Sequence, residues 1–352
     1  MSHQIIENVI IKGISTCVPH NVEINSTYPY FEEGEAEKVI LSTGIKQRHI
    51  APDDVTASDL CYNAAEDLIK NLGWNKSDID CLIFVSQSQD YILPATSCVL
   101  QGRLNIPEKC ATFDISYGCS GWIYGMALIS SLLSGGMMKK GLLLVGDTPS
   151  KFKNRKDKTA WPLFGDAGSA TALEFSPGAS SINFSLFADG SKYKSIIIPE
   201  GGCRVPFNEG SLVEKKYADG IVRRGIDSVM DGLNVFSFGM TKGPEVTKDV
   251  LALSGVNIDD VDYFFFHQAN MFMNEKIRRK LKIPAEKVPY CLENYGNTSC
   301  ATIPLTIDAN FSTPACLNGK TIVATAFGVG LSWGALCTKL NGLSHLSLLE
   351  YV

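Results

Sequence analysis

The sequence predicts an α/β protein built from two similar halves, and three observations lead to this prediction. Short apolar runs alternate along the chain with segments of helical spacing. Three segments of the first half have counterparts in the second half, in the same order. The 352 residues are 45% hydrophobic and 20% charged, which is enough apolar mass for one large core or two ordinary ones. We therefore expect β-sheets that are covered by helices.

The predicted elements follow in chain order. The first residues, 1–15, alternate as one strand. Apolar runs bounded by turn residues predict four buried strands, namely "CLIFVSQS" (81–88), "GLLLVGD" (141–147), "YFFFHQA" (263–269) and "TIVATAF" (321–327). Helical spacing predicts three helices, namely "ASDLCYNAAEDLIKNLG" (57–73), "GWIYGMALISSLLSGG" (121–136) and "MNEKIRRKLKI" (273–283).

The two halves of the chain resemble each other. "LGWNKSDIDCLIFVSQS" (72–88) matches "SGVNIDDVDYFFFHQAN" (254–270), and this aligns Val85 with His267. "PEKCATFDISYGCSG" matches "AEKVPYCLENYGNTS", and this aligns Cys119 with Asn297. "LFGDAGSATALEF" matches "AFGVGLSWGALCTKL". Because the order is shared, we expect a duplicated unit whose halves, 1–178 and 179–352, pack with an approximate two-fold relation.

Cys119 is a candidate nucleophile. It lies between two glycine-containing turns, after the strand-like "ATFDIS" and before the helical "GWIYGMALISSLL". The free N–H groups and the positive dipole end of a helix N-terminus favour a thiolate, and they can lower a cysteine pKa to roughly 3.5–7.5. A cysteine chosen at random is more often buried and inert, but the position and the repeat partner of Cys119 favour a functional role.

His267 and Asn297 are candidates for the same cleft. His267 ends the run "YFFF", where its imidazole would reach the carboxyl edge of a sheet, and it is the one histidine of the five that belongs to a duplicated segment. Asn297 belongs to a turn-prone sequence, but its equivalence to Cys119 predicts that it lies across the two-fold from the thiol. A thiolate with two hydrogen-bond donors suits acyl transfer and the stabilisation of an oxyanion.

The motifs "GCSG", "HQAN", "YGNTS" and "FGVGLSWG" resemble the signatures of β-ketoacyl-[acyl carrier protein] synthase III, a condensing enzyme of the thiolase superfamily. The resemblance extends from "STGIKQRHIA" (42–51) to "LSWGALC" (331–337). It implies a five-layer αβαβα fold, a homodimer, and a decarboxylative Claisen condensation. An acyl group on the cysteine would react with malonyl-[acyl carrier protein], giving 3-oxoacyl-[acyl carrier protein] at the start of fatty acid or related acyl chain synthesis.

The resemblance also implies residue roles. Cys119 would take the acyl group from acyl-CoA or acyl carrier protein, and His267 and Asn297 would stabilise the enolate of the malonyl thioester. The remaining residues fall into two groups. The oxyanion hole and acyl pocket would use Val329, Phe327, Asn270 and Leu93. The oxyanion donors would be the backbone N–H groups of Cys119 and Val329, and Leu93 belongs to the loop "DYILP" that closes the pocket of the partner subunit. CoA or the acidic acyl carrier protein would bind Lys158, Lys276, Arg278, Arg279 and Lys280. No metal or cofactor is implied.

Five positions depart from the family pattern. One is Val329, which stands where the family has a loop glycine, keeps the N–H and adds bulk near the acyl group. Lys38 and Ser42 stand where a Trp and an Arg commonly hold the CoA adenine, and Lys158 replaces another CoA-contacting Arg. Phe272 replaces a basic residue that often contacts the carrier protein. The condensation chemistry is therefore expected to be retained, whereas the acyl donor is not specified by the sequence.

Composition excludes several classes of protein. The net charge of −5 argues against nucleic-acid binding, and no apolar run is convincing as a membrane span. The eleven cysteines contain no C-x-x-C pair, so we expect reduced thiols and a cytoplasmic protein. The first residues are not typical of a signal or transit peptide.

Four alternatives stay open at this point. The first is a non-decarboxylating acyltransferase that acts on an alcohol or amine, although such relatives often alter the residue at Asn297. A thiolase is disfavoured because Cys337 lies beyond the glycine loop, within a strand pattern. A chalcone-synthase-like enzyme shares the same three residue types. A non-catalytic scaffold for a carrier protein would leave Cys119 without chemistry.

Overall fold

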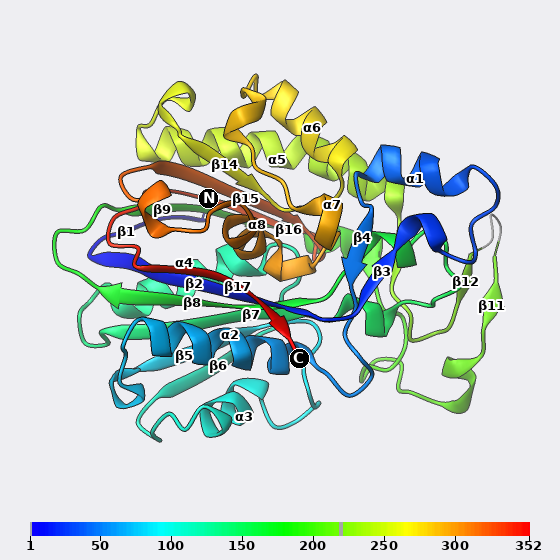
Figure 1. The fold of residues 1–352 in the computed structure, drawn as a ribbon, viewed down its shortest axis with the longest axis horizontal. Helices are drawn as coiled ribbons and strands as arrows, with labels where there is room; N and C mark the ends of the chain where they lie inside the picture. Colours follow the sequence, from blue (N-terminus) through cyan, green and yellow to red (C-terminus); the bar gives the residue numbers. More distant parts are fainter. Residues whose placement is uncertain (1, 218–220) are drawn as a thin grey trace.

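Two stacked β-sheets form the centre of the protein, and helices lie outside them and between them (Figure 1). The structure is a computed structural model that describes residues 2–217 and 221–352. The six-stranded sheet has the order β17 (His345–Tyr351), β2 (Val9–Pro19), β8 (Ala167–Phe175), β7 (Lys140–Asp147), β5 (Cys81–Val85) and β6 (Ala111–Ile115). The five-stranded sheet has the order β1 (Ser2–Ile6), β9 (Ile182–Ala188), β16 (Ser332–Lys339), β15 (Thr321–Gly328) and β14 (Tyr263–Phe266).

The helices complete a five-layer αβαβα arrangement, as the resemblance implied. The outer layer on the six-stranded sheet holds α2 (Ala57–Asn71) and α3 (Thr96–Arg103), and the outer layer on the five-stranded sheet holds α5 (Gly232–Ser254) and α6 (Met271–Lys280). Between the sheets lie α4 (Gly121–Leu133) and α8 (Thr302–Asn310). Because α4 packs between the two sheets, Trp122, Met126 and Ile129 are fully buried.

The duplication predicted from the sequence is confirmed by the topology. In the six-stranded sheet, the neighbouring strands β2, β8, β7 and β5 form two antiparallel pairs and then a parallel pair. In the five-stranded sheet, the strands β9, β16, β15 and β14 form the same series of pairs. The first matched pair of segments contains β5 and β14, and the third contains β8 and β16. In β14, Phe265 packs between the sheets while Phe264 and Phe266 pack under the outer helices, which explains the unbroken apolar run.

The expected single strand at residues 1–15 is wrong, because the structure has two strands there in different sheets. β1 pairs with β9, and β2 pairs with β8 and β17. Asn8 separates them with a left-handed φ of 63°, a conformation that Asn tolerates better than most residues. The terminal strands thus cross between the halves, and the boundary at residues 178 and 179, which falls between β8 and β9, stays a prediction.

Several smaller elements form a lobe at one end of the sheets (Figure 1). It contains the antiparallel pairs β10 (Ile196–Ile197) with β13 (Val229–Met230) and β11 (Lys215–Lys216) with β12 (Val222–Arg223). Nearby lie β3 (Val22–Ile24), β4 (Gln47–His49), α1 (Glu35–Thr43) and α7 (Leu292–Tyr295). The lobe is fastened to the 149–164 loop, because Ser228 N–H donates to Phe152 O at 2.8 Å and Arg223 binds Asp157.

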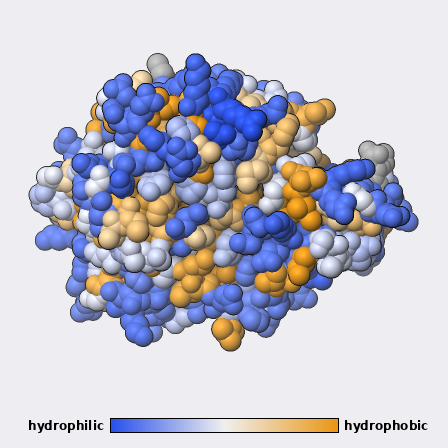
Figure 2. Space-filling view, turned by 45° about the horizontal axis from the view of Figure 1, so that its top comes forward, coloured by the Kyte–Doolittle hydropathy of each residue, from blue (hydrophilic) through white to orange (hydrophobic). Residues whose placement is uncertain are grey.

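The face of the molecule seen in Figure 2 is mostly hydrophilic, with separate hydrophobic areas. Among residues 2–217 and 221–352, no helix combines the length and the hydropathy that would be needed to cross a membrane.

Candidate active site

A cavity of about 740 Å³ is lined by residues of both halves and by the small lobe. Its wall contains six of the residues that the sequence nominated, namely Cys119, His267, Asn270, Asn297, Phe327 and Val329. These residues lie just before α4, between β14 and α6, in the 296–299 turn, and at the end of β15 and directly after it. The structure therefore brings together the nucleophile and donors predicted from separate motifs.

Cys119 lies just before α4, where the chain turns from β6 into the helix. Ser120 is the N-cap, and Gly121 N–H donates to Gly118 O at 2.6 Å. The surrounding backbone comes unusually close, because a Cβ added at Gly328 would lie only 2.5 Å from the Cys119 Sγ. Ser120 and Ser332 join their hydroxyls at 2.7 Å, which fastens the start of α4 to the 328–332 turn.

The net pKa of the Cys119 thiol is raised, chiefly by burial, and this differs from the lowering expected at a helix N-terminus. Three groups act in the opposite direction: the N–H groups of Val329 and Cys119 itself, and the ammonium of Lys153. The first two are the N–H groups nominated for the oxyanion hole. Asp147 adds to the rise because its negative charge opposes a thiolate. The thiol is therefore partly buried and faces donors that stabilise negative charge.

His267 follows β14 and is almost fully buried. Its backbone N–H donates to Thr325 O at 2.8 Å, and the ring Nδ1 lies 2.7 Å from the Thr302 hydroxyl. Burial lowers the pKa of His267 to about 3, so the imidazole is neutral at physiological pH. A neutral ring has one donor and one acceptor. If the Thr302 hydroxyl donates to Nδ1, then Nε2 carries the proton and serves as a donor.

Asn297 has a fixed amide orientation. Its Oδ1 accepts from Ser299 N–H at 2.9 Å, so the amide nitrogen, which is a donor, is left for the cavity. Ser299 adopts a left-handed φ of 55° to present that N–H. The backbone around Asn297 packs closely against the segment 163–165. Asn297 N–H donates to Leu163 O at 2.9 Å, and a Cβ added at Gly165 would lie 2.2 Å from Tyr295 O.

The other nominated cavity residues have clear structural contacts. Phe327 meets the His267 ring edge to face, with the ring centroids 6.0 Å apart. Asn270 caps α6 by accepting from Met273 N–H at 2.8 Å, which accounts for its presence apart from any contact with substrate. Val329 O accepts from the Ser332 hydroxyl at 2.7 Å, and this holds the Val329 peptide in place.

The residues nominated for binding CoA or the carrier protein, and Leu93 of the predicted acyl pocket, lie outside the cavity wall. Leu93 is 80% exposed on the single chain. Lys158 lies with its ammonium 2.7 Å from Glu35. The basic residues of α6 differ among themselves. Lys276 and Arg279 line a small surface groove together with Leu41, Ser42 and Phe272, whereas Arg278 is bound to Glu275 and to Ile283 O, and Lys280 donates to Met240 O. Their roles in binding stay predictions.

Sequence reasoning missed two cations of the cavity wall. Lys153 and Arg223 both line it. Lys153 belongs to the charged run 150–158, which is typical of a solvated loop, and Arg223 lies in the lobe that has no counterpart in the repeat. No signal in the sequence distinguished Lys153 from its neighbours.

Comparison with known proteins agrees with the fold and with the motifs. The sequence model of the 3-oxoacyl-[acyl-carrier-protein] synthase III family matches residues 113–190, and the model of its C-terminal part matches residues 251–340. These segments contain Cys119 and, in the second, His267, Asn297 and Val329.

Named relatives extend the similarity over most of the chain. A putative 3-oxoacyl-[acyl-carrier-protein] synthase 3 of Campylobacter jejuni subsp. jejuni is 34% identical over 88% of this chain and 86% of its own. A beta-ketoacyl-[acyl-carrier-protein] synthase III of Fusobacterium nucleatum subsp. nucleatum is 31% identical over 95% of this chain and 99% of its own. The crystal structure of a 3-oxoacyl-(acyl-carrier protein) synthase from Burkholderia xenovorans LB400 is 36% identical, with a TM-score of 0.92 over 99% of both chains.

The fold thus defines a thiolase-like transferase of the condensing-enzyme class. Within that class, the chain belongs to the 3-oxoacyl-[acyl-carrier-protein] synthase III family.

Proposed function

We propose that this chain condenses an acyl group, held as a thioester on Cys119, with malonyl-[acyl carrier protein]. The products are 3-oxoacyl-[acyl carrier protein], carbon dioxide and the free thiol of the acyl donor. The observation that carries the proposal is that one cavity holds the Cys119 thiol together with the His267 imidazole and the Asn297 amide. Membership of the family supports the same reaction, and with it a role in the initiation of acyl chain synthesis.

Acylation comes first in the proposed reaction. The Cys119 thiolate attacks the donor carbonyl, the bond from that carbon to the donor sulfur breaks, and the donor leaves as a thiolate that takes up a proton. The negative oxygen of the tetrahedral intermediate accepts from the N–H groups of Cys119 and Val329. Both groups already act on the thiolate as donors, and backbone N–H groups fixed in this way stabilise an oxyanion.

Condensation follows on the acylated cysteine. The carbon–carbon bond to the malonyl carboxylate breaks, carbon dioxide leaves, and the electron pair forms an enolate. His267 Nε2–H and the Asn297 amide stabilise the enolate oxygen. The enolate carbon then attacks the acyl carbonyl, the same two N–H groups receive the negative charge, and the Cys119 thiolate leaves. These steps require no metal or cofactor, since acyl-CoA and malonyl-[acyl carrier protein] are substrates.

The fixed orientation of Asn297 favours condensation over simple acyl transfer. Because Ser299 N–H occupies Oδ1, the donor end of the amide remains for substrate. An enolate formed by decarboxylation needs such a donor, whereas transfer of an acyl group to an alcohol or amine does not. We therefore place the non-decarboxylating acyltransferase second.

The partners and compartment follow from the proposed reaction. Acyl carrier protein is acidic, so Lys276 and Arg279 beside the α6 groove are candidates for its contact. Tyr91, Ile92 and Leu93 are 59%, 86% and 80% exposed on the single chain, and a homodimer would cover this apolar loop. Acyl-CoA and acyl carrier protein are expected in the cytoplasm, with no role for nucleic acid or membrane.

Intact-protein mass spectrometry tests the proposal. The wild-type protein is expected to gain the mass of the acyl group from a donor thioester, and Cys119→Ser is expected to lose this gain, because an unactivated hydroxyl lacks thiolate character. A Cys119→Ser variant that acquires the same mass would contradict the assignment. A wild-type protein that binds malonyl-[acyl carrier protein] but is never acylated and releases no carbon dioxide would support a scaffold.

A further inference from the structure

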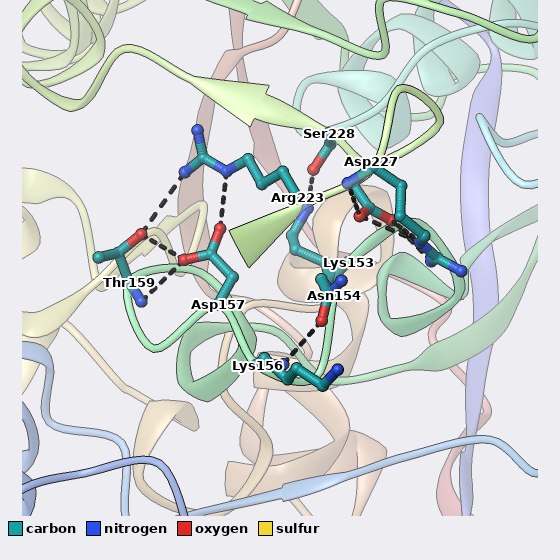
Figure 3. A network of polar contacts seen from close by, with 9 residues as sticks. Lys153, Asn154, Lys156, Asp157, Thr159, Arg223, Asp227 and Ser228 are labelled. Carbon is teal, nitrogen blue, oxygen red and sulfur yellow. Dashed lines mark hydrogen bonds and ion pairs between the residues drawn. The ribbon is translucent and has the colours of Figure 1, made fainter. Parts of the chain in front are cut away.

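Lys153 extends from the charged loop 150–158 into the wall of the cavity that contains Cys119. Figure 3 shows its surroundings. Its ammonium donates to the Ser228 hydroxyl. It also lies 4.0 Å from the centroid of the Phe164 ring. Ser228 is itself held by its N–H, which donates to Phe152 O at 2.8 Å. Two elements, the loop and the lobe, thus fix the position of one positive charge beside the nucleophile.

Two carboxylates near Lys153, those of Asp157 and Asp227, favour its charge, but each forms an ion pair with an arginine instead. Asp157 is bound by Arg223, with 2.7 Å between Oδ2 and Nε, and Asp227 is bound by Arg224 at 2.7 Å (Figure 3). In the described part of the chain, no carboxylate forms an ion pair with Lys153 within 4.0 Å. Burial accordingly lowers the pKa of Lys153 to about 8, and at neutral pH most of the molecules still carry the charge.

The largest favourable electrostatic contact of Lys153 is with Cys119. That contact exists only while Cys119 is a thiolate, because acylation removes the negative charge. The ammonium then keeps the Ser228 hydroxyl and the Phe164 ring as neighbours, but it loses the negative charge of the thiolate. A cation withdrawn from water is unfavourable unless it is paired. An anionic group on the acyl chain would restore a partner at that stage.

We propose that Lys153 makes this cavity select an acyl group that carries a carboxylate, on a short chain that begins at Cys119. The proposal rests on the proposed function, since it concerns the acyl group that Cys119 receives. The chemical class of donor is an ω-carboxyacyl thioester. The Ser228 hydroxyl and the Phe164 ring hold the ammonium in place.

The test compares acylation rates of Cys119 for matched pairs of donors. Succinyl-CoA is paired with butyryl-CoA, and glutaryl-CoA with pentanoyl-CoA, and intact mass is followed over time. We expect the wild-type protein to favour the charged member by about 10-fold or more at one chain length at least, since charge-assisted hydrogen bonds are among the stronger ones. Lys153→Met should slow both donors, because the thiolate loses a stabilising charge, but it should lose about 10- to 100-fold more with the charged donor than with the alkyl donor.

Two variants serve as controls. Lys153→Arg keeps the positive charge and should keep the preference. Lys156→Met makes the same change on the same loop, but Lys156 is paired with Glu214 outside the cavity, so both rates should stay at the wild-type level. A folding defect in Lys153→Met would be seen as a lower Tm, and the ratio measured on the wild-type protein decides the question without that variant.

Two results would overturn the proposal. One is a wild-type protein that uses the alkyl donors as well as the charged donors at both lengths. The other is a Lys153→Met variant that slows all donors equally, which would show that the lysine acts only on the Cys119 thiolate and does not recognise the acyl chain. Failure of the proposed function differs from both, because Cys119 would then be acylated by no donor at all.

Discussion

Replacement of Thr302 by valine should weaken condensation while sparing acylation. The Thr302 hydroxyl lies 2.7 Å from His267 Nδ1 and 3.1 Å from Ser299 O, and it has one proton to donate. If it donates to Nδ1, the imidazole carries its proton on Nε2, where the proposed reaction needs a donor. If it donates to Ser299 O, the imidazole carries its proton on Nδ1 and Nε2 becomes an acceptor. Thr302 is thus a positioning residue for the His267 proton.

The size of the effect follows from the hydrogen bond that is lost. A hydrogen bond of this kind contributes about 0.5–1.5 kcal/mol, which corresponds to a factor of about 2 to 12 in the population of the Nε2–H form. Thr302→Val, which is close to isosteric, should therefore lower malonyl decarboxylation by roughly 2- to 12-fold. His267→Ala removes the donor altogether and should cost on the order of a hundred-fold or more. Thr302→Ser keeps the hydroxyl and should stay near the wild-type rate.

Two assays separate the steps. Labelled carbon dioxide released from malonyl-[acyl carrier protein] measures decarboxylation, and the intact mass after a single turnover with acyl-CoA measures acylation. Loss confined to the first assay is expected for Thr302→Val, together with a lower Tm, because the buried Nδ1 and Ser299 O lose a partner. Wild-type decarboxylation in Thr302→Val, or equal losses in both assays, would refute the role given to Thr302.

Three further predictions concern pH, packing and the donor. Because burial lowers the pKa of His267 to about 3, the imidazole stays neutral above that pH, and decarboxylation should show no loss from its protonation between about pH 5.5 and 7.5; a limb with a midpoint near 6.5 would contradict this. Gly328→Ala should abolish acylation in a folded protein, because the added Cβ would lie 2.5 Å from the Cys119 Sγ; an active variant would show that the contact relaxes. Lys38 and Ser42 cannot sandwich an adenine as Trp and Arg do, a contact of roughly 0.5–2 kcal/mol. The protein should therefore be saturated only weakly by acetyl-CoA. If acetyl-CoA binds tightly and acylates Cys119 faster than every other donor, this reasoning is wrong.

The sequence predicted the duplicated fold and the three central residues because both depend on local patterns. A strand buried on both faces must be apolar throughout, as at 263–266, and a residue that follows such a strand reaches the edge of the sheet. Cys119 could be placed because the change from strand to helix is visible in the chain. The split near Asn8 was missed because residues 1–15 alternate through it, and only pairing with two different sheets separates β1 from β2.

The rest of the cavity depends on tertiary placement that no local pattern records. Lys153 is one of five basic residues between 150 and 158, and what separates it from the others is the lobe that folds back over the loop. The direction in which the Cys119 pKa shifts could also not be predicted from the sequence. A helix N-terminus predicts a lower pKa, but the cavity encloses the thiol, and the desolvation of the thiolate outweighs the nearby donors.

The raised pKa of Cys119 and the lowered pKa of Lys153 have one cause, which is the shared burial of the two groups. Transfer of the thiol proton elsewhere would create a thiolate beside an ammonium, and each charge would then relieve the desolvation of the other. The resting cavity therefore holds its nucleophile mostly as a thiol, and the thiolate becomes favourable as its donors align around it. Acylation then removes the negative charge and leaves the ammonium beside the new acyl chain. The same two residues that prepare the nucleophile for attack would in this way also determine which acyl group the cavity retains.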